Sequence, residues 1–216
     1  MSFTDIREKE KEERRRVILE AAEKLFFSKG FDNVSMGDIA QEVGVNRATL
    51  YLYFKDKESI FFAIVLRSIR IMRDMFREGV ARETTGIRKI EATGRAFFNF
   101  YRQYPDYCRL FHYSGSDRFD ATCCEDAREI MALNQEIMMT MVDSIIIGMK
   151  DGTIRSDLNP LEVAVFLSTA SQSVISLQPG FRAALQSQGI GFEEYVEHSL
   201  DFMRHAMISS RKEQEK

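Results

Sequence analysis

Side chains able to contact DNA are concentrated in a twelve-residue segment, NRATLYLYFKDK. Arg47 carries a fork of donors that can pair with the two acceptors on the edge of a guanine base. Thr49 could contact a thymine methyl group or a phosphate. The hydroxyls of Tyr51 and Tyr53 and the ammonium group of Lys57 are suited to phosphates, which position a protein on the duplex without reading its sequence. We therefore interpret this segment as a candidate DNA-reading surface.

The local pattern predicts two short helices, joined by a tight turn, that hold these side chains. Gly44 should end the first helix, because glycine readily adopts the left-handed conformation found at helix C-termini. Asn46 follows as a side-chain cap for the second helix. Leu50 and Phe54 form one apolar stripe on that helix, so its other side chains should face outward, as on a recognition helix. The apolar residues of the first helix recur at helical spacing: Met36, Ile39, Ala40 and Val43.

These motifs stand in an order that resembles the DNA-binding region of the TetR family of transcriptional regulators. The matching motifs are Leu25-Phe26-Phe27, Gly30-Phe31, Ser35, Asp38-Ile39-Ala40, Gly44-Val45, Thr49-Leu50-Tyr51, Tyr53-Phe54 and Lys57. The matching segment runs from about Arg14 to about Phe62. The resemblance implies an all-α fold, with an N-terminal three-helix helix-turn-helix DNA-binding domain and a C-terminal helical ligand-binding and dimerisation domain.

The resemblance also implies that residues on both short helices contact DNA, with Arg47 reading a base and most of the others holding the backbone. Two residues depart from the family pattern. Leu52 stands where the family often has His or Trp, so a polar contact is lost there. Gly37 stands where it often has Arg or another polar residue, which leaves that helix with less to offer. The residues expected at the DNA are Ser35, Asn46, Arg47, Ala48, Thr49, Tyr51, Tyr53 and Lys57.

Composition favours a packed, all-helical protein. Of the 216 residues, 44% are hydrophobic and only three are proline, and helical periodicity is much commoner than the alternating pattern of strands. No apolar run approaches the ~18 residues of a transmembrane helix. The charged start, MSFTDIREKEKEERRR, is unlike a secretory signal or a transit peptide. We therefore expect a cytoplasmic protein without a membrane segment.

The net charge of −3 is compatible with DNA binding because the charges are unevenly distributed. Residues 1–57 hold eleven basic and eleven acidic side chains, so the acidic excess lies in the remainder. Between Gly44 and Lys57 there are three basic residues and one acidic residue. Because phosphate neutralisation is local, we expect modest non-specific affinity and dependence on two copies acting together. The charged run before residue 17 could be a solvated helix end or an extension that reaches DNA.

Breaks in the helical pattern suggest three parts: a DNA-binding domain at 1–57, a regulatory and dimerisation domain at 58–210, and a charged tail at 211–216. Pro105 should end the helix before it, since the residue preceding a proline is disfavoured from helical geometry. Asn159 and Pro160 should open a later helix as cap and first residue. Helices are expected at about 8–28, 57–83, 87–104, 124–150, 160–178 and 192–209, with a loop at 114–122 and a looser stretch after 180.

Aromatic residues are unusually dense in the segment FFNFYRQYPDYCRLFHY. They could pack two helices together at a corner of the core, or they could line a cavity, because Tyr and His carry polar tips usable in an apolar site. The methionines of the following helix could be core filler or an adaptable pocket lining. We expect an apolar or aromatic ligand rather than a strongly charged one. The residues that would line this site are Phe97, Tyr101, Tyr107, Phe111, His112, Met138 and Met141.

The three cysteines are Cys108, Cys123 and Cys124. An odd number in a chain without a signal sequence argues against a disulfide framework. The adjacent pair with His112 could form a thiol or metal sensor, but the spacing matches no standard zinc pattern. The simpler interpretation is that the two adjacent cysteines are small residues at the start of a helix. The sequence also contains no phosphate loop, nucleophile elbow, paired-carboxylate site or histidine-rich cluster, so we expect neither an enzyme nor a bound cofactor or metal.

The hypothesis that accounts for most of these features is a ligand-responsive, homodimeric transcriptional regulator, most often a repressor in similar proteins. Two recognition helices would read half-sites of a palindrome ~34–36 Å apart. In similar proteins the segments at 160–178 and 192–209 pack against the partner copy as a four-helix bundle. Small residues in the first segment, such as Ala164 and Ser168, permit close approach, although an internal contact needs the same. The alternative is a helical partner-binding or scaffold protein that has lost operator binding.

Overall fold

The protein is described by a computed structural model over residues 3–115, 119–120 and 124–208. Ten helices, α1–α10, make up most of this part, and its β-pairing is one isolated bridge between Ile154 and Ile208. The all-α fold expected from the sequence is therefore confirmed. The helices gather into two compact units: unit 1 contains 1–69 and 106–131, and unit 2 contains 70–105 and 132–216. The expected tail and Cys123 lie outside the described residues.

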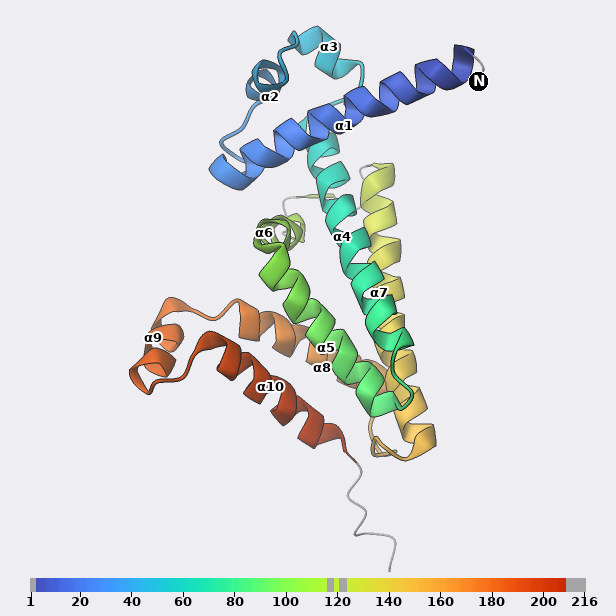
Figure 1. Ribbon diagram of the computed structural model, residues 1–216, viewed down its shortest axis with the longest axis vertical. Coiled ribbons are helices and arrows are strands. Elements are labelled where there is room, and N and C mark those ends of the chain that lie inside the picture. The colour runs from blue at the N-terminus through green and yellow to red at the C-terminus, as the bar shows by residue number, and fades with distance from the viewer. Residues whose placement is uncertain (1–2, 116–118, 121–123, 209–216) are drawn as a thin grey trace, which may run out of the picture. The chain divides into compact units, whose positions relative to one another are not determined.

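Unit 1 is built around the N-terminal helices shown at the blue end of Figure 1. It comprises α1 (Phe3–Lys29), α2 (Met36–Val43), α3 (Arg47–Tyr51), the first part of α4 (Lys57–Ala81), α6 (Pro105–Ser114) and the start of α7 (Glu125–Asp151). Its core is apolar and strongly aromatic, and contains Phe26, Phe31, Ile39, Leu50, Phe54 and Phe61, each at most 4% exposed. Burying a large apolar side chain stabilises a fold by about 1.5–3 kcal/mol, so these residues account for much of the stability of the unit.

The ends of α2 and α3 follow the local chemistry expected from the sequence. Gly44 has a φ of 78°, the left-handed conformation predicted for it. Asn46 caps α3, because its Oδ1 accepts the Thr49 N–H at 2.7 Å. Ser35 and Asp38 form a capping box at the start of α2, each side chain accepting the backbone N–H of the other residue.

α1 begins earlier than predicted and buries a narrower face. The predicted start was residue 8, whereas the helix is already formed at Phe3. Ile18 and Ala22 are buried, but Val17 is 41% exposed. Val17 stands at the edge of the apolar stripe, where a helix still faces water. The ten residues from Asp5 to Arg14 are all exposed.

Two helices were not anticipated. Residues 105–114, treated as a corner, form α6, and the stretch after residue 180, expected to be loose, belongs to α9 (Pro179–Ser187). Both helices begin at a proline, whose fixed φ suits the first helical position. α5 ends just before Pro105, as expected, but Pro105 also starts a new helix, and Pro179 starts α9 after α8 has ended at Ile175.

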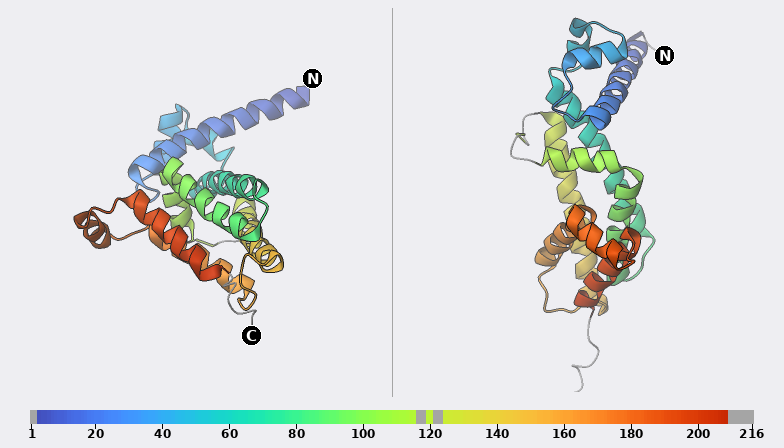
Figure 2. Two further views of the ribbon diagram at one scale, coloured as in Figure 1. Left: turned by 60° about the horizontal axis from the view of Figure 1, so that its bottom comes forward. Right: turned by 90° about the vertical axis from the view of Figure 1, so that its left-hand side faces the viewer.

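Unit 2 contains the remainder of α4 and α7, with α5 (Gly86–Gln103), α8 (Pro160–Ile175), α9 and α10 (Phe192–Met207). α5 packs against α8 and α10, which also contact each other, and α9 lies at the end of this pair, where it joins them (Figure 2). The predicted start of α8 is confirmed, since Asn159 Oδ1 accepts the N–H groups of Leu161 and Glu162 at 3.0 and 3.3 Å. The end of α10 is joined to the loop after α7, where Arg155 N–H donates to the Met207 carbonyl at 3.0 Å.

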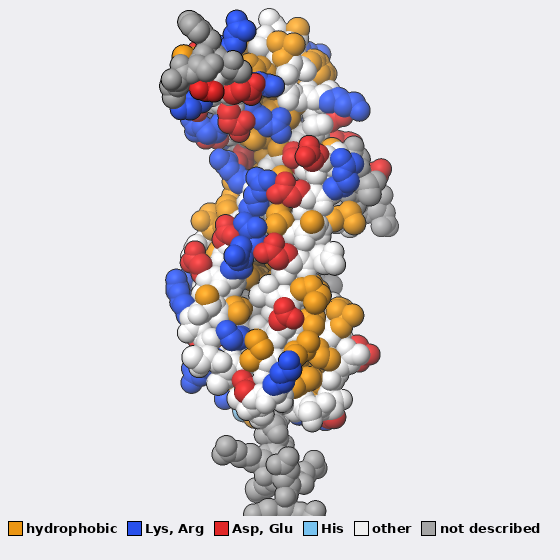
Figure 3. Space-filling model, turned by 90° about the vertical axis from the view of Figure 1, so that its right-hand side faces the viewer, with side chains coloured by type: hydrophobic (Ala, Val, Ile, Leu, Met, Phe, Trp, Pro, Cys, Tyr) orange, Lys and Arg blue, Asp and Glu red, His pale blue; other side chains and the backbone are white. Residues whose placement is uncertain are grey.

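The surface of unit 2 carries several large apolar side chains. Leu161, Val165 and Phe166 on α8 are 47–62% exposed, and Phe202 on α10 is 77% exposed. On the face drawn in Figure 3, hydrophobic side chains gather over the lower part of unit 2. Exposed apolar side chains that gather on one face are typical of a region that another protein surface covers.

By length and composition α7 could cross a membrane, since one 18-residue window of it has a mean hydropathy of 1.4. The sequence was expected to contain no such segment. α7 also carries Glu136 and Asp143, both exposed. Its other face places Ile137, Met141 and Ile145 in the core of unit 2. The core helix of a soluble protein can be equally long and apolar.

Candidate nucleic-acid interface

The outward face of α3 carries the residues that were expected to read DNA. Leu50 is completely buried and Phe54 is 2% exposed, so these two residues fix which side of α3 faces the core. Arg47 and Ala48 are consequently exposed, and Tyr51 is 52% exposed. A helix held by one apolar side, with an arginine and a tyrosine at the other, can be inserted into a major groove.

Two of the expected contact residues are only partly available. Thr49 is half-buried, and its hydroxyl donates to Asn46 Oδ1 at 3.0 Å, which leaves its methyl group and an acceptor lone pair. Tyr53 is also half-buried, and its carbonyl oxygen accepts a hydrogen bond from Arg15 Nη1 at 3.2 Å. The guanidinium of Arg15 lies 4.2 Å from the centre of the Phe54 ring, so it braces the end of α3 from α1.

Lys57 points its ammonium group into unit 1. Nζ donates to the Phe31 carbonyl at 2.8 Å and lies 4.1 Å from the centre of the Phe31 ring. Lys57 was expected to hold a phosphate, and the Phe31 carbonyl accepts one of the three N–H groups of its ammonium. In the observed arrangement it joins the start of α4 to the turn after α1.

The exposure of Leu52 could not be predicted from the sequence. It follows α3 directly and is 77% exposed, beside the exposed Tyr51. Sequence reasoning treated Leu52 as the loss of a polar contact. An apolar side chain at this place can instead contact a thymine methyl group in the major groove.

The capping box at α2 fixes the backbone on the other side of the turn. Asp38 Oδ2 accepts the Ser35 hydroxyl at 2.6 Å and the Ser35 N–H at 2.7 Å. These hydrogen bonds, helped by nearby Lys29 and Arg47, hold the pKa of Asp38 below its ordinary value of 3.8. The first N–H groups of a helix can hold an anion, and here Ser35 itself is exposed.

Substitution of Ser35 by alanine is expected to lower the free energy of unfolding by about 1 kcal/mol at neutral pH, the usual effect of losing an N-cap. Because the folded pKa of Asp38 is lowered, its stabilisation is present above pH 3.8 and is lost as the pH falls through the lower folded value. The difference between wild type and Ser35→Ala should therefore shrink between pH 7 and pH 3 in urea unfolding. An equal difference at both pH values would show that Asp38 takes no part.

The residues expected to line a ligand site are divided between the two units. Tyr107, Phe111 and His112 lie in unit 1. The Tyr107 hydroxyl donates to Glu23, which is also paired with Arg67 at 3.0 Å. Burial and this carboxylate raise the pKa of Tyr107, while burial lowers the pKa of His112. These groups join α6 to α1 and α4. The expected residues in unit 2 are Phe97, Tyr101, Met138 and Met141.

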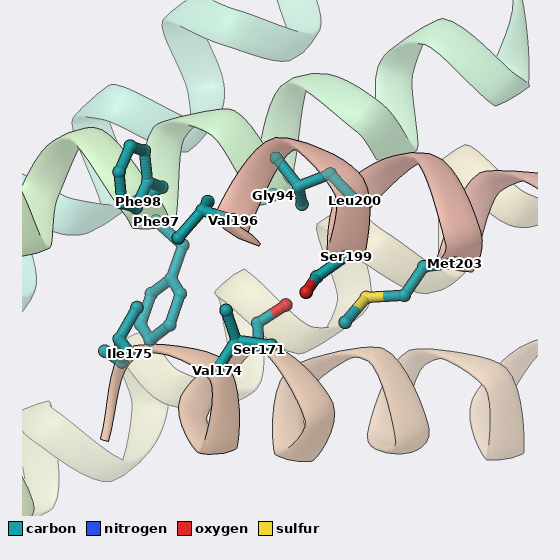
Figure 4. A pocket seen from close by; sticks show the side chains of 10 residues that line it. All are labelled: Gly94, Phe97, Phe98, Ser171, Val174, Ile175, Val196, Ser199, Leu200 and Met203. Atoms are coloured by element: carbon teal, nitrogen blue, oxygen red, sulfur yellow. The ribbon is translucent and has the colours of Figure 1, made fainter. Parts of the chain in front are cut away.

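A pocket in unit 2 lies between α5, α8 and α10, and of the expected residues it includes Phe97 alone. The space among its side chains amounts to about 240 Å³ when the part open to solvent is counted, and its enclosed part is about the size of one water molecule. Figure 4 shows the Ser171 and Ser199 hydroxyls directed towards one another near the sulfur of Met203. Its lining residues, none of them charged, are Gly94, Phe97, Phe98, Ser171, Val174, Ile175, Val196, Ser199, Leu200 and Met203. The lining is therefore apolar, with only neutral polar groups.

The described cysteines show no sign of a shared site. Cys108 is buried, and burial raises the pKa of its thiol to about 11. Cys124 is half-buried, and its Sγ accepts the Ala127 N–H at 3.4 Å near the start of α7. Over residues 3–115, 119–120 and 124–208, no three His, Cys, Asp or Glu side chains come together as a possible metal site.

The part of the chain that matches a known protein family contains the helices described above. Residues 18–64 match the family described as bacterial regulatory proteins, tetR family. This match runs from α1 to α4 and contains the whole of α2 and α3. Over 70 residues the chain is 39% identical to an HTH-type transcriptional regulator of Staphylococcus aureus (strain USA300), covering 32% of this chain and 38% of the relative. The match therefore spans well under half the length of the curated relative.

Solved structures match nearly the whole chain. A transcriptional regulator of the TetR/AcrR family from Thermobifida fusca YX-ER1 is 25% identical, with a TM-score of 0.69 over 89% of this chain and 97% of that one. The ketosteroid regulator KstR2 of Mycobacterium tuberculosis is 18% identical, with a TM-score of 0.69 over 91% and 96%. AibR, solved with isovaleryl coenzyme A and operator DNA, is 18% identical, with a TM-score of 0.68 over 88% and 97%. At 18% identity, the last two establish a common fold.

Proposed function

We propose that this chain, which belongs to the tetR family of bacterial regulatory proteins, is a homodimeric transcriptional repressor that binds a palindromic operator. The observation that carries the proposal is the outward face of α3, with Arg47 and Tyr51 exposed inside the segment that matches the family. Two copies of α3 would enter successive major grooves ~34–36 Å apart. A DNA-binding repressor is expected to work in the cytoplasm.

The contacts divide by chemistry. Arg47 would read a guanine through its fork of donors, and Leu52 and the Thr49 methyl group would contact thymine methyl groups. Ser35, Tyr51 and Tyr53 hold phosphates on either side, and Asn46 and Ala48 lie against the groove wall. Lys57 would hold a phosphate with the N–H donors that the Phe31 carbonyl does not use. Phosphate contacts give affinity and register, while the few base contacts give specificity.

The second copy covers the apolar surface of α8 and α10. Phe166 and Phe202 are 62% and 77% exposed, and the two helices are already packed side by side. A partner that presented the same two helices would bury both aromatic side chains. Since the same patch occurs on both copies, a two-fold axis satisfies both at once.

An effector would regulate DNA binding from the pocket between α5, α8 and α10. Suppose that a small molecule binds more tightly to a dimer whose two copies of α3 are not spaced to fit the operator. Linkage then requires the operator affinity to fall when the small molecule binds. The uncharged lining favours an apolar molecule with one neutral polar group. AibR was solved with both operator DNA and a coenzyme A ester, which supports a joint response to DNA and a small molecule.

The DNA-binding proposal is tested by selecting duplexes from a random library with the full-length chain and footprinting the protein on the enriched sequence. We expect a palindrome protected on one face, in two successive major grooves. If no sequence is enriched over the starting library, operator binding is ruled out, and the scaffold alternative takes its place.

Replacing Ser171 and Ser199 by alanine is expected to change which small molecules bind. The Ser199 hydroxyl already donates to the Tyr195 carbonyl at 2.8 Å, so a ketone would accept one hydrogen bond, from Ser171. Because one neutral hydrogen bond contributes about 0.5–1.5 kcal/mol, a cyclic ketone should bind about 2- to 10-fold more weakly to the double variant. The corresponding hydrocarbon should bind equally well to both proteins. Thermal shift titrations with the two compounds make the comparison. Equal weakening of both would show that the hydroxyls do not contact the ligand.

A further inference from the structure

Gly37 lies at the second position of α2, and the guanidinium of Arg47 occupies the place where a side chain at residue 37 would be. A Cβ atom built on Gly37 would lie 2.3 Å from Arg47 Nη2, 2.8 Å from Nε and 2.9 Å from Cζ. Real Cβ atoms essentially never make contacts below 3.0 Å. The observed conformation of Arg47 is therefore possible only because residue 37 has no side chain.

Arg47 also interacts electrostatically with the first turn of α2. The pKa of Asp38 is lowered first by its hydrogen bonds to Ser35 and also by the positive charge of Arg47. Arg47 begins α3, whereas Gly37 and Asp38 lie in the first turn of α2. The arginine side chain thus lies back along α2, across the turn, while remaining exposed to solvent.

We propose that Gly37 is a positioning residue for Arg47, which sets the direction from which the guanidinium approaches a base. The inference rests on the proposed function, in which Arg47 reads the operator. Bidentate pairing needs the planar guanidinium in one orientation, and an arginine already confined near that orientation loses less side-chain entropy on binding. From the sequence, Gly37 was expected only to lack a DNA contact. In this proposal Gly37 contributes to the base specificity of Arg47.

Gly37→Ala is the variant that separates this role from a structural one. The atoms in its way belong to the end of a flexible side chain, so Arg47 moves and the backbone does not. Alanine is also the better helix former, so the melting temperature should stay the same or rise. Affinity for the duplex selected with the wild-type chain should fall about 2- to 10-fold, the size expected for the ordering of one long side chain. Affinity for an unrelated duplex of equal length should change less than about twofold, since Arg47 keeps its charge.

Gly180→Ala is a matched control for the change in helix propensity. Gly180 is also the second residue of its helix, α9, and a Cβ there would meet nothing within 4 Å. This variant should have an equal or higher melting temperature and the operator affinity of the wild type. If Gly180→Ala weakened operator binding as much as Gly37→Ala, the effect would not come from Arg47 and the inference would be overturned.

A double-mutant cycle completes the test. In the Arg47→Ala background, Gly37→Ala should leave operator affinity unchanged, because no guanidinium remains to be displaced. The same loss in both backgrounds, or no loss in the wild-type background, would overturn the inference while leaving the proposed function intact. If Arg47→Ala itself left operator affinity unchanged, the base-reading role of Arg47 would fail, and the inference with it.

Discussion

Arg47→Ala should lower affinity for the selected operator about 5- to 150-fold per half-site, because a good bidentate contact contributes ~1–3 kcal/mol of discrimination between bases. Affinity for a random duplex should fall much less, since only one phosphate-attracting charge is lost. The structure supports this difference, because Arg47 is exposed at the start of α3 while Leu50 and Phe54 are buried. Fluorescence anisotropy at one fixed salt concentration measures both affinities.

Arg47→Lys is the control that keeps the charge and removes the fork. It should retain the affinity of the wild type for random DNA and lose most of the preference for the operator. If Arg47→Ala weakened binding to both duplexes by the same factor, Arg47 would be a phosphate contact, and base reading would have to come from another residue of α3.

Phe202→Glu should convert the protein into a monomer and reduce operator binding by a factor of about 10²–10⁴, the usual gain from linking two binding modules. Phe202 is 77% exposed on α10, and a carboxylate there would be buried without a partner in the proposed dimer. Light scattering should give the 25.0 kDa mass of a single chain for the variant and twice that for the wild type.

Phe181→Glu is the matched control, since Phe181 is 62% exposed but lies on α9. It should remain dimeric and bind the operator as the wild type does. A wild-type protein that is already monomeric at low micromolar concentration would contradict the dimer itself. A Phe202→Glu variant that stays dimeric would instead place the interface away from α10.

The ends of α2 and α3 could be predicted from residues that are adjacent in the sequence. Gly44 was expected to be left-handed and Asn46 to cap α3, and both are confirmed. These predictions succeed because a cap involves groups only three residues apart, so that its hydrogen bonds are decided by the adjacent sequence. The start of α8 at Asn159-Pro160 was predictable for the same reason.

The helix boundaries were less predictable near prolines, because a proline can follow the end of one helix and also begin the next. Pro105 was correctly expected to interrupt a helix, yet it also begins one, as Pro179 does. A short helix of nine or ten residues is marginal alone and depends on packing for its stability. α6 provides an example, because Tyr107 reaches Glu23 of α1 and Tyr113 reaches Asp32 at 2.7 Å. Partners more than eighty residues away leave no signal in the local pattern.

By itself, the sequence determined the all-α fold, the resemblance to the tetR family and the side of α3 that faces outward, since periodicity and caps decide which side of each helix is apolar. Only the tertiary structure decided what individual side chains do there. Lys57 binds the Phe31 carbonyl, and Arg47 lies in the space left by Gly37. Both are long, flexible side chains whose position depends on atoms that the folded chain brings near, so residue type and spacing could not specify it.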